Sequence, residues 1–398
     1  MKNDFSTLLK TYIQDLNLNV DKINIFIDIQ NLSIGRYDSR IAEQYMLKEN
    51  YTPIETVHQL LYWLSIKHNE IYNELGILPK FILYTDKNRN LFNSNFIPSW
   101  KADRKKSFEK MMQENPVEYQ YRQFANQSIK STFNILGKFI NKSTALRMII
   151  LEYIDSDFIP YVEKIRNPNS LNVILSSDHD YYHMLTEDEY TIRYIFLEKI
   201  RESRKTALEH MYNSWVGVKK KYSVNEEEAK YIAKYYSVYH SLIGDASDHV
   251  PSLIKRKGIK YWLKKTLNNL PDLQTIRDNV LNNECFIDEL LDYKADSVLF
   301  KDKAFKPKTK WDEFRMRYFI FDFYFTGHFL NRDNNEKSYK IYEKFILNFP
   351  YQKQLIDKIT ESYTKQMNED KLNIDEANEL LMKLGINDSL YISQSLFY

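Results

Sequence analysis

Short apolar segments that end at or near an aspartate alternate with helical segments in the first half of the chain, and this alternation constrains the fold most. We expect four strands, at Ile23 to Asp28, Phe81 to Asp86, Met148 to Leu151 and Val173 to Asp178. Apolar residues recur at helical spacing from Ile54 to Leu75, and a second helix is expected from about Phe124 to Ile140. The pattern predicts an α/β domain with a mostly parallel central sheet flanked by helices.

The second half of the chain has a different pattern. From about Ile243 onward no clear strands are predicted, and Tyr261 to Leu270 and Trp311 to Phe329 have helical spacing. We therefore expect a helical C-terminal half. A chain of 398 residues is long enough for one or two domains.

Overall charge excludes little, because 56 basic and 54 acidic residues leave a net charge of +2. Cys285 is the only cysteine, which excludes a disulfide within the chain and a zinc site built from several cysteines. We expect no signal peptide in the first residues, which include acidic and polar side chains, and no membrane span, since no apolar run reaches about 20 residues. We expect a soluble, cytoplasmic protein with no membrane partner.

Aspartates follow the expected strands, and two more stand in the sequence GDASD. The candidates are Asp28, Asp86, Asp155, Asp157, Asp178, Asp180, Asp245 and Asp248. One aspartate after a strand is usually a cap or turn residue, but several carboxylates at one sheet edge repel each other unless a cation neutralises them. Oxygen ligands favour Mg²⁺ or Mn²⁺, and two such ions can hydrolyse a phosphodiester. The pattern predicts a metal-dependent nuclease.

The order of these motifs resembles that of the 5′ nuclease family, which contains flap endonucleases and bacteriophage RNase H type exonucleases. The resemblance covers roughly Ile23 to Leu330. FIDIQN and TDKN are similar to the family's first two metal-binding aspartates, and SWKADRKKS to its YKxNR segment. LSSDHDYYHML is similar to its SxDxDxxQL element, and LIGDASDHVPSLIKRKGIKYW to its GDxxDNxPG helix-turn-helix element. The phage-type resemblance also suggests a viral source.

The resemblance implies a PIN-like catalytic α/β domain at 1–240, with a basic arch or clamp at about 87–125. A helix-turn-helix-like DNA-binding region would follow at 241–330, and 331–398 is a helical region without an assigned role. Two Mg²⁺ ions are implied, with Mn²⁺ as a substitute. The first ion would be held by Asp28, Asp86, Asp155 and Asp178. The second would be held, or oriented through water, by Asp180, Asp245 and Asp248.

The third strand departs from the family, which has Glu-Ala-Asp-Asp where this chain has Glu152-Tyr-Ile-Asp155-Ser-Asp157. Alignment without a gap puts Asp155 at the family's first aspartate and Tyr153 at its glutamate. A shift of one residue instead puts Asp155 at the glutamate and makes Asp157 the ligand. We favour Asp155, which can also act as the N-cap of a helix that begins near Phe158.

Two basic segments are candidates for nucleic-acid contacts. Around Trp100 and Phe108, cations and aromatic rings alternate as in single-strand binding sites, with Lys101, Arg104, Lys105 and Lys106. The resemblance implies that Lys101 and Arg104 position the scissile phosphate. In the second segment the family's glycines are missing, and the positive charge comes from Lys255, Arg256 and Lys257. His179 is expected to point away from its aspartate neighbours.

These observations lead to the hypothesis of a monomeric, structure-specific 5′ nuclease that acts on DNA or RNA–DNA hybrids with a free 5′ end or flap. Removal of RNA primers and contacts with replication proteins, such as a clamp or a single-strand-binding protein, are expected from the resemblance. One alternative is a homologue with weakened catalysis that binds branched DNA, because the glutamate is missing. Another is a metal-dependent RNase of the wider PIN-like fold.

Overall fold

The computed structural model describes residues 5–29, 53–87, 90–101, 104–117, 119–120, 123, 130, 134–137, 145–176, 180–193, 215–296, 298, 300, 303–368 and 373–397. At 53, 55, 56 and 104–108 it describes the main chain alone. The expected helix from Phe124 to Ile140 lies mostly outside these ranges. So do Asp178, at the expected end of the fourth strand, and His179.

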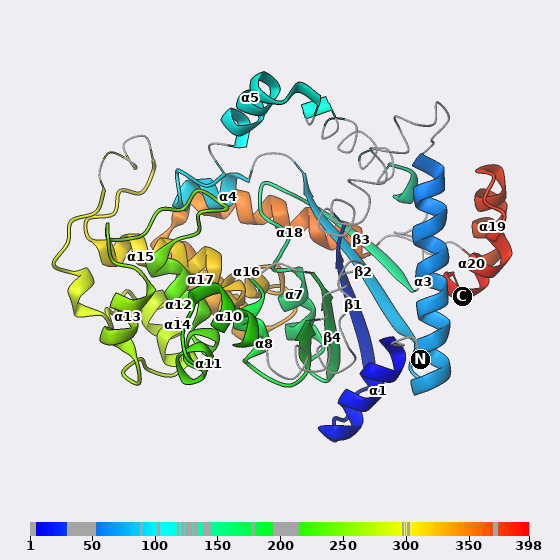
Figure 1. The fold of residues 1–398 in the computed structure, drawn as a ribbon, viewed down its shortest axis with the longest axis horizontal. Helices are drawn as coiled ribbons and strands as arrows, with labels where there is room; N and C mark the ends of the chain where they lie inside the picture. The colour runs from blue at the N-terminus through cyan, green and yellow to red at the C-terminus, as the bar shows by residue number, and fades with distance from the viewer. Residues whose placement is uncertain are drawn as a thin grey trace.

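A five-stranded parallel sheet forms the centre of the first half and confirms the predicted α/β class (Figure 1). The strands are β1 (Lys22–Asp28), β2 (Pro79–Lys87), β3 (Leu146–Glu152), β4 (Ser170–Leu175) and β5 (Thr191–Arg193), in the order β3-β2-β1-β4-β5. All four pairings are parallel. Strand β5 was not predicted, because three residues at the edge are too few for a periodic pattern.

The strands are apolar on both faces because each face is covered by helices. On one face, Ile25 and Ile27 of β1 pack in a core with α1 (Phe5–Asp15) and α3 (Pro53–Leu75). On the other face, Phe26 belongs to a second core, which continues through α7 (Ile159–Arg166) into the helical half. This second core contains residues from both sides of residue 240, where the first expected domain ends. The expected domain boundaries stay a prediction.

The helical half contains α10 (Trp215–Tyr222), α11 (Glu226–Lys234), α12 (Tyr236–Ile243), α13 (Ile259–Thr266), α14 (Leu273–Asn282), α15 (Lys310–Phe321), α16 (Phe323–Leu330), α17 (Glu336–Asn348) and α18 (Lys353–Met367). The single helix expected from Trp311 to Phe329 is therefore two helices. Asp322 separates them, because it has extended backbone angles and its side chain accepts a hydrogen bond from the Tyr324 N–H. This carboxylate also binds Arg277.

The last residues return to the sheet domain. The Gln366 side chain on α18 accepts a hydrogen bond from the Ile150 N–H and donates one to the Ile150 carbonyl, at 2.8 and 3.0 Å. It thus satisfies backbone groups on the outer side of the edge strand β3. Beyond it, α19 (Ile374–Lys383) and α20 (Ser389–Leu396) pack on the α3 side of the molecule (Figure 1).

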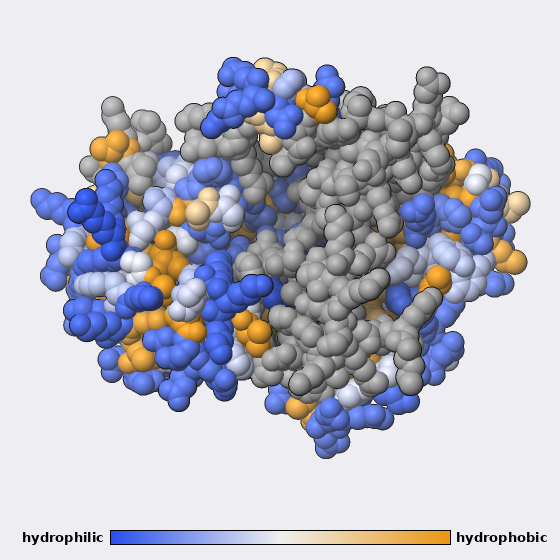
Figure 2. Space-filling view, viewed as in Figure 1, coloured by the Kyte–Doolittle hydropathy of each residue, from blue (hydrophilic) through white to orange (hydrophobic). Residues whose placement is uncertain are grey.

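The surface in Figure 2 is mainly hydrophilic, and apolar residues form small, scattered patches on the part that the structure describes. Within the described ranges, none of the helices combines the length and the apolar character needed to cross a membrane.

Candidate active site

The carboxyl ends of the parallel strands bring several of the predicted aspartates to one edge of the sheet. Asp28 is the last residue of β1, and Asp86 lies next to the end of β2. β1 and β2 are neighbours, and β4 lies on the other side of β1, where the chain order reverses. In open α/β sheets, ligands bind beyond the carboxyl ends at such a reversal.

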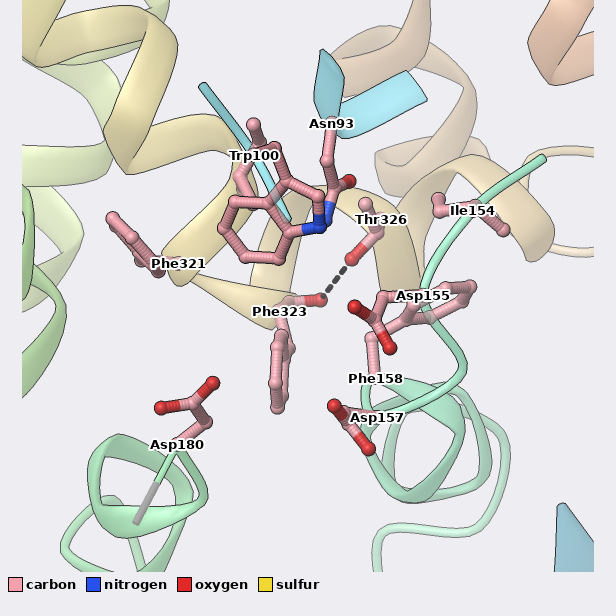
Figure 3. Close-up of a pocket in the computed structure, with 11 residues that line it drawn as sticks. Asn93, Trp100, Ile154, Asp155, Asp157, Phe158, Asp180, Phe321, Phe323 and Thr326 are labelled. Carbon is pink, nitrogen blue, oxygen red and sulfur yellow. Dashed lines mark hydrogen bonds between the residues drawn. The ribbon is translucent and has the colours of Figure 1, made fainter. Parts of the chain in front are cut away.

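Three predicted carboxylates, Asp155, Asp157 and Asp180, line one cavity just beyond this edge (Figure 3). The first two follow β3, and Asp180 follows β4. The opposite wall is aromatic and includes Trp100, whose buried indole N–H points into the cavity and has no hydrogen-bond partner in the part of the chain that the structure describes. The cavity volume is about 20 Å³, room for roughly one or two water molecules.

Lys101 connects this cavity to the GDASD loop. Its ammonium group forms an ion pair with Asp155, and its backbone N–H donates to the Asp248 carbonyl at 2.9 Å. Its φ of +51° is in the left-handed region, so the chain turns sharply at this contact. Asp155 is not the N-cap residue of the following helix, because that position in α7 is occupied by Phe158.

A pair of buried tyrosines orients Asp157: Tyr181 contacts the carboxylate, and Tyr84 contacts Tyr181. The Tyr181 hydroxyl donates to Asp157 Oδ1 at 3.1 Å, and the Tyr84 and Tyr181 hydroxyl oxygens are 2.5 Å apart. Burial, followed by the charge of Asp157, keeps the pKa of Tyr181 well above its usual value. Tyr181 is therefore a neutral donor that fixes the orientation of the Asp157 carboxylate.

Asp180 belongs to a second cluster, with His240 on α12 and Asp245 in the GDASD loop. One possible ligand atom from each of the three side chains lies within 4.8 Å of the others. Burial would raise the pKa of Asp245, but hydrogen bonds from His240 and Ser247 hold it well below its usual range. Gly244 makes this loop possible, since it has a φ of +74° and a Cβ there would lie 2.2 Å from the Val250 carbonyl oxygen.

Tyr153, at the position expected for the glutamate, has a φ of +71°. Its carbonyl accepts a hydrogen bond from the Phe92 N–H at 2.8 Å, and its side chain packs against the core of the helical half. Phe92 belongs to α4 (Leu91–Phe96). The residue thus joins β3 to α4 and supplies no carboxylate.

The basic residues predicted to contact nucleic acid differ in how much of them the structure describes and in their exposure. Arg104, Lys105 and Lys106 start α5 (Arg104–Glu114), at the top of Figure 1, but their side chains lie outside the described parts. Lys255 and Arg256 are exposed. Arg256 has a φ of +66°, where a glycine would be unstrained.

Lys257 differs from Lys255 and Arg256, because its ammonium group lies in an aromatic and acidic environment. It pairs with Glu289 and hydrogen-bonds the hydroxyls of Tyr261 at 3.0 Å and Tyr293 at 2.9 Å. Both tyrosine ring centroids are 4.5 Å from its Nζ. Its position therefore stabilises the loop, and its predicted contact with phosphate stays a prediction.

Sequence reasoning missed His240, Tyr84 and Tyr181. His240 stands five residues before Asp245, and only the end of α12 and the turn at Gly244 bring the two together. Tyr84 is part of an apolar strand pattern that gives no sign of its hydroxyl contact. The sequence indication of Tyr181 as a site residue was its position directly after the DxD motif.

No family model matches the chain, and no curated protein matches its sequence. Among solved structures, the fold is similar to "Crystal Structure of T5 D15 Protein Co-crystallized with Metal Ions", at 13% identity and a TM-score of 0.48, covering 87% of this chain and 99% of that one. A zinc-bound structure of T5 5′-exonuclease has 12% identity, a TM-score of 0.48, and coverage of 85% and 99%. A lysine-to-alanine mutant of that exonuclease has 12% identity, a TM-score of 0.35, and coverage of 94% and 99%.

Proposed function

We propose that this protein is a metal-dependent, structure-specific 5′ nuclease. It would hydrolyse phosphodiesters of DNA or RNA–DNA hybrids near a free 5′ end or flap, in replication or repair, including the removal of RNA primers. The observation that carries the proposal is the cavity at the carboxyl edge of the sheet, where Asp155 and Asp157 face Asp180 across a space for roughly one or two water molecules. The order of the sequence motifs supports the same reaction.

The residues fit a hard divalent cation such as Mg²⁺ or Mn²⁺. Carboxylate oxygens line the cavity, and the positive group of Lys101 already lies against Asp155. Asp28, Asp86, Asp155, Asp157 and Asp178 are the candidates to hold one ion, and Asp180, Asp245 and Asp248 to hold or orient a second. When bound, such ions activate water and stabilise the leaving oxygen of a phosphodiester.

The chain's own groups have separate tasks in this proposal. Lys101 is placed to attract a phosphate oxygen, because its ammonium group pairs with Asp155, one of the carboxylates that line the cavity. Tyr181 keeps Asp157 oriented, and the Trp100 N–H offers a donor to an oxygen in the cavity. Lys255 and Arg256 are exposed and would contact duplex phosphates, which positions the substrate without reading its sequence.

One observation favours a second function, a branched-DNA binding module with weakened catalysis. Tyr153 contributes no carboxylate at the position where the resemblance implies a metal ligand, and its backbone contact with Phe92 keeps it packed. The loss of one ligand lowers the charge that holds an ion.

A comparison of substrates tests the proposal. A labelled 5′-flap DNA duplex, a 5′-flap RNA–DNA hybrid and single-stranded RNA are incubated with and without Mg²⁺. We expect cleavage of flap substrates only with the metal, and no cleavage of a matched duplex with a 3′ flap. Cleavage of single-stranded RNA alone would favour the PIN-like RNase, and tight binding without cleavage would favour the binding module.

A further inference from the structure

The His240 ring lies between two carboxylates, at two different distances. Its Nε2 is 2.9 Å from Asp245 Oδ2, and its Nδ1 is 3.7 Å from Asp180 Oδ1. The first distance is that of a normal hydrogen bond, and the second is too long for one. Two atoms that bind the same metal at about 2.0 to 2.2 Å lie roughly 3 to 4 Å apart. The position of Nε2 is therefore that of a hydrogen-bond donor to Asp245, and the position of Nδ1 suits a metal ligand shared with Asp180.

The orientation of the ring is fixed by its surroundings. The His240 side chain is 2% exposed, and it stacks on Phe321 with the ring centroids 4.1 Å apart and an angle of 21°. Asp245 is itself held, since its Oδ1 accepts hydrogen bonds from the Ser247 N–H at 2.7 Å and the Ser247 hydroxyl at 2.5 Å. A carboxylate that accepts the proton of one ring nitrogen sets the tautomer in which the other nitrogen can bind a metal.

A second, independent feature indicates a ligand in the cavity that Asp180 shares with Asp155 and Asp157. The buried Trp100 N–H points into this cavity and has no hydrogen-bond partner among the described residues (Figure 3). Trp100 is 7% exposed, so an unsatisfied donor there is costly. A metal-bound water or a phosphate oxygen in the cavity would accept this hydrogen bond.

We propose that Asp180 Oδ1 and His240 Nδ1 bind the same divalent cation, while Asp245 orients His240 and is not itself a ligand. This inference rests on the proposed function and deepens it, because one of the two ion sites then has a nitrogen ligand. An imidazole ligand favours Mn²⁺, Co²⁺ or Zn²⁺ over Mg²⁺ more than carboxylates alone do. The remaining positions would be filled by water.

Electron spin-echo spectroscopy of bound Mn²⁺ tests the nitrogen ligand directly. The full chain is prepared with ¹⁵N-labelled histidine, and Mn²⁺ alone is added as the probe. We expect a ¹⁵N coupling in the wild type and in the control variant His179→Gln, and its loss in His240→Gln. A coupling that persists in His240→Gln but disappears in His179→Gln would overturn the assignment.

Two substitutions at His240 separate ligation from the contact with Asp245. In His240→Asn, the side-chain oxygen can reach the position of Nδ1 but not that of Nε2, whereas His240→Gln can reach the position of Nε2. We expect the Mn²⁺ affinity measured by calorimetry to fall about tenfold or more in His240→Gln, and less in His240→Asn. The reverse order would mean that His240 acts only through Asp245. If His240→Gln does not fold, the spectrum of His240→Asn decides the question, because its side-chain oxygen gives no ¹⁵N coupling.

Cleavage of the 5′-flap duplex in Mg²⁺ is measured on the same preparations, so that the two proposals can fail separately. A wild type that cleaves the flap but has no ¹⁵N coupling overturns the histidine ligand and leaves the nuclease in place. A wild type with the coupling that cleaves no substrate overturns the nuclease and supports the metal site.

Discussion

Two clusters of acidic side chains occupy different environments in this molecule. At the sheet edge, Asp155, Asp157 and Asp180 face a common cavity. In the interior, Glu187 and Asp322 both bind Arg277, and Asp322 makes a two-point contact at 2.8 and 3.0 Å. Lys164 adds a second cation to Glu187 at 3.0 Å.

The interior cluster is a structural element that joins the two halves of the molecule. Glu187 follows β4 and the short helix α8 (Tyr182–Leu185), whereas Arg277 and Asp322 belong to the helical half. Here every carboxylate has an internal cation. At the sheet edge, Asp155 also has a cation, Lys101, but the three carboxylates line a cavity with room for roughly one or two water molecules. Acidic residues near strand ends are therefore candidates for metal binding when they line a cavity.

The largest effect on stability is expected from Arg277→Met. The change leaves Glu187 and Asp322 buried without their shared cation, and breaking such a pair costs about 3 to 5 kcal/mol. Denaturant unfolding measures the loss. Lys340→Met, which breaks the exposed pair with Glu336, is the control and should cost about 0.5 kcal/mol or less. Equal losses would contradict the structural role of the interior cluster.

The interior cluster should also make stability depend on pH. Burial would raise the pKa of Glu187, but Arg277 and Lys164 outweigh burial and lower it from 4.5 to about 2. Because the pKa is depressed in the folded state, this stabilisation is present above pH 4.5 and is lost as the pH falls toward 2. We expect the free energy of unfolding to fall by roughly 3 kcal/mol across this window. In Glu187→Gln, the free energy of unfolding should depend less on pH. An unchanged profile would contradict the assignment.

The same substitution in the two clusters should change the free energy of unfolding by different amounts. Asp322→Asn removes a charge at a side chain that is 1% exposed and should cost about 1 to 3 kcal/mol of unfolding free energy. Asp180→Asn, at 19% exposure, should change stability by about 0.5 kcal/mol or less in metal-free buffer, because it relieves repulsion. Thermal melts in a chelator provide the measurement, and a larger loss for Asp180→Asn would undermine the comparison.

The smallest expected effect concerns duplex binding. Lys255→Ala combined with Arg256→Ala removes two exposed cations and should lower the salt dependence of binding by about 2 in the log–log slope. Lys257→Ala should leave the slope nearly unchanged, because its charge is already paired with Glu289. Fluorescence anisotropy against salt concentration checks both variants. An unchanged slope in the double variant would remove this segment from the interface.

Much of the sheet domain could be predicted, because strand patterns and strand-terminal aspartates are local properties. Asp28 and Asp86 are at the strand ends where the pattern put them. The break at Asp322 was not predictable from apolar spacing, since it comes from the extended backbone of Asp322 and its hydrogen bond with the Tyr324 N–H, and the apolar pattern continues across it. The edge strand β5 has too few residues for a pattern.

The site was predictable as a set of carboxylates but not as a set of contacts. The sequence pattern included Asp180 and Asp245, but the position of His240 between them results from the end of α12 and the turn at Gly244. In the same way, the Tyr84 and Tyr181 hydroxyls meet only because β2 and the segment after β4 come together across β1. Long-range contacts of this kind leave no periodic trace in the sequence.

We expect metal-dependent cleavage of a 5′ flap to depend on the carboxylates at the sheet edge. Cleavage and binding of one labelled flap duplex in Mg²⁺ are compared for the wild type, Asp178→Asn, Asp180→Asn and the exposed control Asp333→Asn. We predict that the two site variants bind the flap at least as tightly as the wild type but cleave it about 1000-fold more slowly or worse, about 4 kcal/mol in activation free energy. Asp333→Asn should cleave normally. Cleavage at the wild-type rate by both site variants, or a wild type that binds tightly and never cleaves with Mg²⁺ or Mn²⁺, would contradict the account.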